Sequence, residues 1–340
     1  MGKEAILVVC PGRGTYGATE LGTFARHAGH PDLARFDAMR AANGAPTLSE
    51  LDGAARFSPS LHASGKNAAP LIYAAGWLDF LALDLARFEV VAVTGNSMGW
   101  YTALACAGAV SGEHGFAIAD AMGTHSGRHG DGGQLLVSLV GEDWCAAPTL
   151  RTDVLARAAH HGATLSIDLG GMLVLAGTGA ALDALLRDLP PLPGRAAMRL
   201  AGHGPFHTPL MAESSRAALA SLSPEWFGRP QVPLIDGTGR IWRRHATVPA
   251  ALHAYTFTAQ ILEPYDFATA ITVGIKEFAP DRIVLVGPGD TLGGAIGQTL
   301  VRENWLGMRD KATFAARQAA DPFLIAMGRA DQRALVEASQ

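Results

Sequence analysis

Residues 95–99 read Gly95-Asn96-Ser97-Met98-Gly99, a G-x-S-x-G pentapeptide that follows the apolar run Val90–Val93 and precedes a helical segment, Trp100–Ala109. This is the sequence of a nucleophile elbow, a tight strand-to-helix turn that lifts a serine hydroxyl clear of a sheet. Glycines are needed in the turn because a Cβ atom would clash there. The following helix points its free N–H groups at the same place, where they can stabilise an oxyanion. The pattern predicts acyl transfer through a serine ester.

Strands and helices alternate along most of the chain. Continuous apolar runs at Ala5–Cys10, Val90–Thr94 and Arg282–Val286 are typical of buried parallel strands, and helical spacing occupies Asn67–Leu85 and Thr291–Val301. We therefore predict an α/β fold with a hydrolase-like large domain and a mostly parallel sheet. The glycine loop after the first strand, Pro11-Gly12-Arg13-Gly14, lacks the spacing of a dinucleotide or P-loop motif.

Residues 134–200 follow a different order. Strand and helix patterns alternate there as β-α-β-β-α-β, which is the order of a ferredoxin-like unit: Leu135–Val140, Pro148–His160, Thr164–Asp168, Met172–Ala176, Ala180–Leu189 and Ala196–Leu200. We expect residues 131–200 to form a small domain inserted into a large body of residues 1–130 and 201–302. Residues 123–133 and Pro190–Gly194 are its expected hinges, and the cleft between the two bodies is the expected substrate entrance. Residues 303–340 are predicted to form a helical tail.

Composition excludes several classes of function. The 340 residues are 49% hydrophobic and carry a net charge of −4, which permits a large core and offers no electrostatic footprint for nucleic acid. No signal sequence is evident, and Asp79 and Asp84 interrupt the longest apolar stretch well short of a membrane span. The three cysteines, Cys10, Cys106 and Cys145, are predicted to be buried free thiols. These features favour a soluble, cytoplasmic protein.

A serine nucleophile requires a base, and His207 is the strongest candidate among twelve histidines. It lies in the segment Gly202–Met211, which returns from the inserted unit to the large domain and should therefore border the cleft. The alternative for His207 is a packing histidine in a proline-bracketed turn. Ten others lie on polar or charged stretches and are expected to be solvated: His27, His30, His62, His114, His125, His129, His160, His161, His245 and His253.

Four motifs together resemble one known family. They are Pro11–Gly14, Gly95–Gly99, Pro205-Phe206-His207-Thr208-Pro209-Leu210-Met211 and Val286–Gly289. In this order and at about this spacing, over residues 5–302, they resemble malonyl-CoA:acyl carrier protein transacylases and the acyltransferase domains of polyketide and fatty acid synthases. The resemblance implies that Ser97 is acylated by an acyl-CoA, with His207 as its base. It also implies that the acyl group passes to the phosphopantetheine thiol of an acyl carrier protein, without a metal or a permanently bound cofactor.

The resemblance also assigns supporting groups. It implies an oxyanion hole made of the backbone N–H groups of Met98 and Arg13, where Arg13 replaces the family's usual glutamine. The side chain of Arg13 is expected to be a surface group that caps the loop. The main-chain carbonyl of Gln260 is expected to orient His207. Three aspartates are expected to be turn or surface residues rather than a third triad member: Asp236, Asp266 and Asp290.

The departure from the family's pattern that matters most is at Met122. Met122 stands where malonyl enzymes carry an arginine that pairs with the free carboxylate of the substrate. Methionine offers instead a flexible apolar wall suited to an alkyl chain. Asn96 and Phe206 are expected to shape the same substrate pocket. Arg128 is a weaker candidate for an alternative carboxylate partner, and Arg13 or Arg128 must supply the clamp if malonyl is the preferred acyl group.

The sequence thus predicts a serine acyltransferase for a non-carboxylated acyl thioester, in fatty acid or polyketide-type biosynthesis. Three alternatives stay open. One is an acyl-thioester hydrolase that clears stalled carrier proteins, since only the choice between water and thiol separates it from a transferase. The others are a malonyl transacylase with a non-standard carboxylate clamp and a non-catalytic module that docks carrier proteins.

Overall fold

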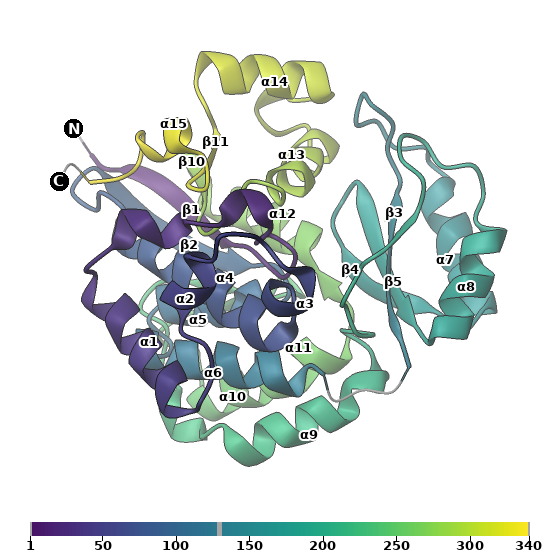
Figure 1. Cartoon of the computed structure of the whole chain (residues 1–340). Helices are drawn as coiled ribbons and strands as arrows, with labels where there is room; N and C mark the ends of the chain where they lie inside the picture. The colour runs from purple at the N-terminus through teal and green to yellow at the C-terminus, as the bar shows by residue number, and fades with distance from the viewer. Residues whose placement is uncertain (1, 128–130, 339–340) are drawn as a thin grey trace.

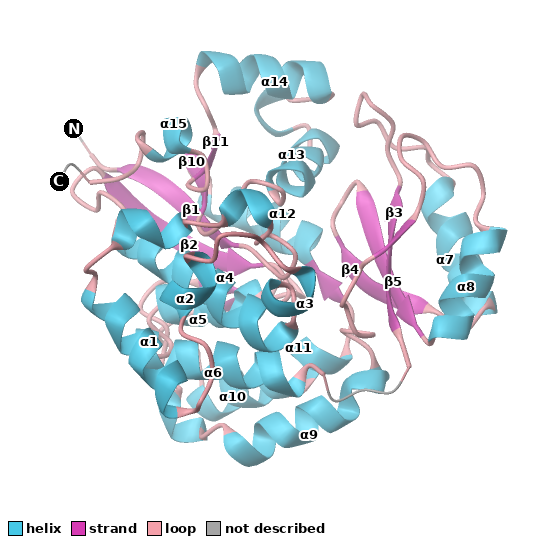
Figure 2. Cartoon of the chain, viewed as in Figure 1, coloured by secondary structure: helices cyan, strands magenta, loops and turns pink. Residues whose placement is uncertain are grey.

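A six-stranded sheet forms the centre of the larger part of the molecule, which is seen here in a computed structural model that describes residues 2–127 and 131–338 (Figures 1 and 2). Its order is β11-β10-β1-β2-β7-β8. All neighbours are parallel except the final pair, β7 and β8. The strands span β1 Glu4–Cys10, β2 Phe88–Gly95, β7 Leu234–Ile235, β8 Ile241–Trp242, β10 Arg282–Leu285 and β11 Leu324–Ala326.

Both faces of this sheet are buried, as a continuous apolar run such as β1 requires. Ile6 and Val8 belong to a core shared with α4 (Gly65–Leu81), α5 (Gly99–Cys106) and α6 (Gly112–His125). Leu7 and Val9 point the other way, into a core shared with α12 (Phe267–Phe278) and α13 (Gly293–Arg302). Alternate residues of one strand thus hold two helical layers on the sheet.

The remaining helices surround these layers. They are α1 Pro31–Ala42, α2 Leu48–Asp52, α3 Pro59–His62, α9 Ala212–Ser221, α10 Pro249–Phe257, α11 Ala259–Leu262, α14 Lys311–Ala320 and α15 Ala330–Arg333. Short 3₁₀ helices span Ala18–Glu20, Thr23–His27, Pro209–Met211, Pro224–Trp226 and Trp305–Gly307. Within the described part of the chain, no helix combines the length and apolarity needed to cross a membrane.

The smaller part of the molecule has its own sheet. Its elements run β3 (Gly133–Ser138), α7 (Leu150–His160), β4 (Thr164–Asp168), β5 (Met172–Gly177), α8 (Gly179–Asp188) and β6 (Met198–Arg199). The antiparallel pairing order is β6-β3-β5-β4, so the predicted ferredoxin-like arrangement is confirmed. Helices α7 and α8 cover the outer face (Figure 1). The inner face turns toward the large body.

A two-residue strand joins this second sheet to the large body. β9 (Tyr265–Asp266) pairs in parallel with the outer edge of β4, although it lies after position 201 in the sequence. The sequence did not predict β9, because two residues are too few for a periodic pattern. The second sheet therefore draws a strand from outside residues 131–200.

The C-terminal segment differs from the predicted helical tail. α14 and α15 are helical, but β11 lies between them and pairs with β10 at the edge of the main sheet. Ile325, Met327 and Val336 belong to the large core. A three-residue strand between stronger helical patterns gives little signal in sequence, and its pairing with β10 decides its conformation.

Two expectations about burial were wrong. Cys145 is exposed, because it lies in the loop that follows β3 rather than in an apolar element. Three histidines expected to be solvated are buried, and each finds a polar partner: His27 with Asp79, His62 with the Leu51 carbonyl, and His253 with the Leu222 carbonyl.

The tight contact between the elbow and β1 gives a stability test. A Cβ atom on Gly99 would lie 2.2 Å from the Cys10 carbonyl oxygen, whereas one on Gly294, in α13, would meet nothing within 4 Å. We expect Gly99→Ala to lower the free energy of unfolding by about 2–3 kcal/mol. The control Gly294→Ala should leave it unchanged or raise it by up to about 1 kcal/mol. Urea denaturation measures both, and equal stability of the two variants would contradict the close approach.

Candidate active site

Ser97 lies at the turn between β2 and α5 with a positive φ of 54°. A non-glycine residue in this left-handed region is strained, and such strain persists only where the surroundings impose it. Here Asn96 N–H donates to the Cys10 carbonyl, and Gly99 N–H donates to the Asn96 carbonyl. The backbone of the elbow is thus held against the end of β1.

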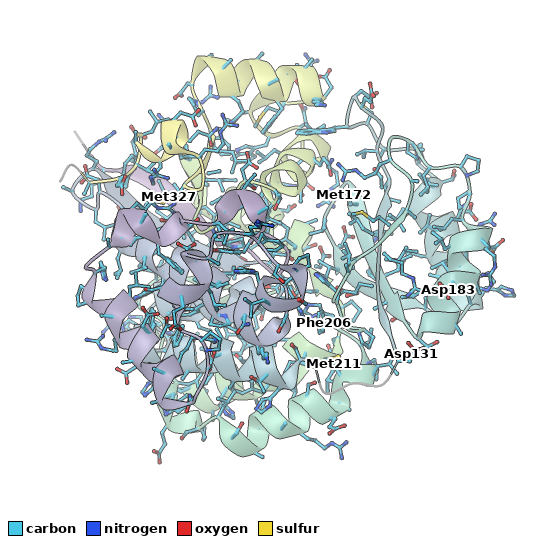
Figure 3. The ribbon with its side chains drawn as sticks, in the orientation of Figure 1. Asp131, Met172, Asp183, Phe206, Met211 and Met327 are labelled. Atoms are coloured by element: carbon cyan, nitrogen blue, oxygen red, sulfur yellow. The ribbon has the colours of Figure 1, made fainter. Side chains whose placement is uncertain are left out.

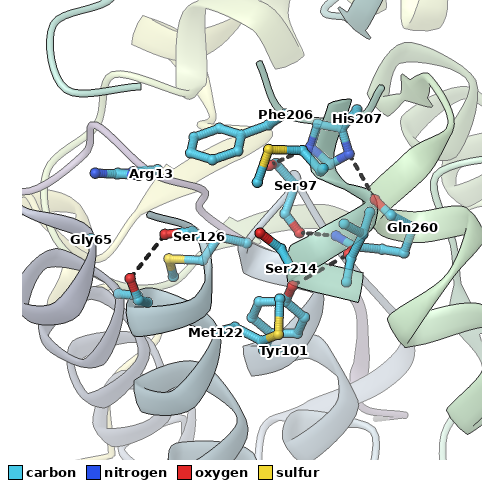
Figure 4. Close-up of a pocket in the computed structure, with 15 residues that line it drawn as sticks. Arg13, Gly65, Ser97, Tyr101, Met122, Ser126, Phe206, His207, Ser214 and Gln260 are labelled. Atoms are coloured by element: carbon cyan, nitrogen blue, oxygen red, sulfur yellow. Dashed lines mark hydrogen bonds between the residues drawn. The ribbon is translucent and has the colours of Figure 1, made fainter. Parts of the chain in front are cut away.

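His207 lies within hydrogen-bond distance of this serine. Its Nε2 is 2.7 Å from Ser97 Oγ, and its Nδ1 is 2.7 Å from the Gln260 carbonyl oxygen (Figure 4). Because a carbonyl can only accept, Nδ1 carries the proton of the neutral ring and Nε2 is left to accept from the serine hydroxyl. The structure therefore brings together Ser97, His207 and Gln260 in the predicted arrangement.

Burial sets the protonation state of His207. The ring is buried, and desolvation lowers its pKa to about 4, although the bond to the Gln260 carbonyl acts in the opposite direction. The imidazole is therefore neutral at physiological pH. A neutral ring with a free lone pair on Nε2 is the form that can take a proton from a hydroxyl.

Gln260 contributes its side chain as well as its carbonyl. The side-chain amide Nε2 donates to the Ser97 carbonyl at 3.0 Å, and Tyr101 Oη lies 3.4 Å from Gln260 Oε1. One residue therefore holds the backbone of the serine and the ring of the histidine. This second contact was not predicted, since the sequence pattern around Gln260 gives no sign of it.

Tyr265 is a further residue that sequence reasoning missed. Its hydroxyl donates to the Gly95 carbonyl at 2.6 Å, and its ring packs against His207 with centroids 5.4 Å apart. Tyr265 belongs to β9, the strand that the sequence did not reveal, so no signal could have found this contact. It ties the second sheet to the elbow.

The three aspartates do not reach His207. Asp236 accepts bonds within its own turn and from Trp242, Asp266 caps α12, and Asp290 lies near Arg329 at the surface. They occupy turn or surface positions, as expected. The candidate site is a serine-histidine pair supported by a carbonyl.

Two backbone donors lie free near Ser97. Among the described residues, the N–H groups of Met98 and Arg13 donate to no acceptor. The loop that carries Arg13 lies against the elbow, because a Cβ atom on Gly12 would be 2.5 Å from the Asn96 carbonyl oxygen. Both N–H groups could therefore donate to an oxygen that develops charge beside Ser97.

A mostly apolar pocket of about 70 Å³ opens beside the pair. Met122 on α6 forms part of its wall, and Phe206 precedes His207 on the other side (Figure 4). The other apolar lining side chains are Ala69, Met98, Tyr101, Met211 and Ile261. Met122 and Phe206 thus lie in the pocket, as predicted. Asn96 lies instead on the neighbouring cleft.

Arg13 is not the surface residue that was expected. Its side chain lines the pocket, stacks over the Phe206 ring at 5.4 Å and donates to the Ala63 carbonyl. Within the described ranges no carboxylate lies close enough to form an ion pair with it. Burial lowers the pKa of the guanidinium to about 10, so it remains charged at neutral pH. Arg128, the other candidate cation, lies outside the described residues.

A cleft of about 620 Å³ leads to Ser97 from between the two parts of the molecule. Met172 and Phe206 mark its two sides in Figure 3. Its walls include apolar side chains from the inner face of the second sheet and from the start of α13 and the residue before it: Leu136, Ile167, Met172, Val174, Leu292 and Ala295. Arg195 and Lys311 also line it, and neither forms an ion pair with a described residue.

Solved structures with the same fold are malonyl-CoA:acyl carrier protein transacylases. The protein of Xanthomonas oryzae pv. oryzae is 21% identical, with a TM-score of 0.74 over 99% of this chain and 100% of its own. That of Synechocystis sp. PCC 6803 is 18% identical, with a TM-score of 0.75 over 98% and 100%. A malonyl-transacylase in complex with its type II polyketide synthase acyl carrier protein is 18% identical, with a TM-score of 0.70 over 88% and 93%.

No protein-family model and no curated protein matches the sequence. At these identities the likeness concerns the fold, and the predicted fold class is confirmed.

The lowered pKa of His207 predicts how the rate of reaction of Ser97 depends on pH. A serine-directed fluorophosphonate should label Ser97 at a rate that is constant from pH 8 to about pH 5 and falls tenfold per unit below about pH 4, where the ring becomes protonated. Intact-mass analysis of the labelled fraction measures this rate, with Ser97→Ala as the blank. A midpoint near the ordinary histidine value of about 6.5 would contradict the assignment.

Proposed function

We propose that this protein is a serine acyltransferase that moves an acyl group between thioesters of coenzyme A and of an acyl carrier protein. The observation that carries the proposal is the 2.7 Å contact between Ser97 Oγ and the unprotonated Nε2 of His207. The fold shared with transacylases supports the proposal of an acyltransferase. Fatty acid or polyketide-type biosynthesis is the setting in which such transfers occur.

In the proposed reaction Ser97 Oγ attacks the thioester carbonyl carbon while its proton passes to His207 Nε2. The oxygen of the tetrahedral intermediate accepts hydrogen bonds from the N–H groups of Met98 and Arg13. Collapse breaks the carbon–sulfur bond, and the departing thiolate takes the proton back from His207. An incoming thiol then repeats the steps in reverse on the acyl-Ser97 ester, so no proton or electron is gained or lost overall.

The cleft suits the arm that such substrates share. Coenzyme A and holo-acyl carrier protein both present a pantetheine chain that ends in a phosphate. The apolar walls fit the chain, and Arg195 and Lys311, which have no carboxylate partner among the described residues, are cations that a phosphate can engage. We therefore propose acyl-CoA and an acyl carrier protein as the partners.

Met122 defines the acyl group in this proposal. It lies buried in the pocket wall, where its thioether cannot pair with a carboxylate. A charged acyl group that entered against this wall would lose water without a compensating bond. The proposed substrate is accordingly a non-carboxylated acyl thioester.

Arg13 supports a second candidate. Its guanidinium lines the same pocket and has no carboxylate partner in the described ranges. If Arg13 binds the malonyl carboxylate in place of the arginine that malonyl enzymes carry at the position of Met122, the protein is a malonyl transacylase whose carboxylate-binding residue lies elsewhere.

The proposed covalent intermediate can be observed directly. After exposure to acyl-CoAs, wild-type protein should gain the mass of one acyl group, because Ser97 forms an ester. Ser97→Ala should gain none, and His207→Ala should react about 10²–10⁴-fold more slowly, the usual range for a positioned base. An adduct in Ser97→Ala would refute the mechanism. An adduct that water removes as fast as a carrier thiol does would identify a hydrolase instead.

The acyl preference separates the two candidates. Wild-type protein should acylate with acetyl-CoA or a longer acyl-CoA about 10–10³-fold faster than with malonyl-CoA, and Met122→Arg should shift the preference toward malonyl. Arg13→Leu should change this ratio little, because its backbone N–H remains. Faster loading of malonyl by wild-type protein, lost in Arg13→Leu, would establish the second candidate.

A further inference from the structure

A chain of buried polar groups runs along the wall of the cleft and ends at a histidine that the mechanism does not use. Ser166 Oγ lies 2.8 Å from the Phe206 carbonyl oxygen, and Gln134 Nε2 lies 2.7 Å from Ser166 Oγ. Gln134 Oε1 in turn lies 2.7 Å from His203 Nδ1. Gln134 is only 2% exposed and Ser166 is fully buried, so the bond between these two side chains is shielded from water.

The donor and acceptor of each of these three hydrogen bonds follow from the first acceptor, the Phe206 carbonyl. The Phe206 carbonyl can only accept, so the Ser166 hydroxyl donates its single proton there and must accept from its other neighbour. The atom of Gln134 that faces Ser166 is therefore the amide nitrogen, which places its carbonyl oxygen toward His203. That oxygen accepts, so His203 Nδ1 carries a proton.

The protonation state of the other ring nitrogen of His203, Nε2, follows from this assignment. In the neutral ring Nε2 has a lone pair and no proton. Burial and the charge of Arg13 lower the pKa of His203 to about 3, so the ring stays in this form at neutral pH. Nε2 lies 3.9 Å from the position that a Cβ of Gly14 would take, and His203 lines the cleft together with Ser97. None of the described residues donates a hydrogen bond to His203 Nε2.

We propose that His203 Nε2 accepts a hydrogen bond from the amide N–H of the pantetheine arm that lies nearest the thioester sulfur. The inference rests on the proposed function, since it concerns the thioester arm of that substrate. An amide N–H that enters a cleft with apolar walls must find an acceptor or lose the bond it made with water.

Other acceptors on the same wall are less suited. Asn96 Oδ1 and Gln298 Oε1 lack partners, but both atoms are buried away from the cleft surface. Thr15 Oγ1 donates to the Gly12 carbonyl and keeps lone pairs that can accept, but Thr15 is only 8% exposed. His203 Nε2 combines an open lone pair with a place beside the glycine loop, close to the backbone donors at Ser97. In the proposal, the amide nearest the sulfur lies there, because it is the pantetheine amide closest to the atoms that react.

An exchange of one atom in the substrate tests this role. S-acetyl-N-acetylcysteamine carries the amide, and S-acetyl-2-acetoxyethanethiol replaces its N–H by an ester oxygen without changing the length. For wild-type protein we expect kcat/KM of Ser97 acylation to favour the amide about tenfold, because the ester oxygen cannot donate and faces a lone pair. In His203→Asn the preference should disappear. Asparagine can still donate to Gln134 but offers nothing at the Nε2 position.

Gln134→Met serves as a second variant, since it leaves His203 in place but removes the acceptor that fixes its tautomer. It should lower the preference only in part. Equal rates with both substrates in wild-type protein, or a preference that survives in His203→Asn, would overturn the proposal.

Failure of the proposed role of His203 can be distinguished from failure of the proposed function. If wild-type protein forms no adduct with either thioester, calorimetric titration of the same protein with pantetheine and with its ester counterpart still measures the hydrogen bond. Tighter binding of pantetheine that is lost in His203→Asn would support the acceptor role. Equal binding would refute it.

Discussion

The contact between the elbow and the end of β1 is the constraint on which the rest of the site depends. Gly99 lies against the Cys10 carbonyl, and Asn96 N–H donates to the same oxygen. This contact fixes the turn with Ser97 in a left-handed conformation. It also holds the loops that follow β1 and β2, which carry Arg13 and Met98, against each other.

His207 depends on a different set of contacts. Its segment leaves the second sheet, and Ser166 on β4 holds the carbonyl of the preceding residue, Phe206. Gln260 orients the ring from the large body, while Tyr265 on β9 packs beside it and bonds to the elbow. The histidine is therefore positioned by both parts of the molecule. A shift of the second sheet would change the distance between Ser97 and His207.

The sequence predicted the features that have strong local or periodic signals. The elbow, the buried strands β1, β2 and β10, and the β-α-β-β-α-β order all follow from apolar patterns and glycine positions. The approach of His207 to Ser97 rested on the resemblance to a family, because 110 residues separate them. Short pairings such as β9 and β11 could not be predicted, since partners distant in sequence decide them. The position of the Arg13 side chain in the pocket could not be predicted either, because its contact with the Phe206 ring joins residues that are distant in sequence.

The strand order has a consequence for synthesis of the chain. β1 precedes β2 in the chain and can pair with it as soon as residues 88–95 have emerged. Its other edge waits for β10 at residues 282–285, and β10 itself waits for β11 at residues 324–326. Until residues 282–285 have been made, the nascent protein therefore carries an unpaired apolar edge on β1, which is a site for wrong pairing with other chains. The main sheet can be completed only after residues 324–326 have been made, because β11 pairs with β10.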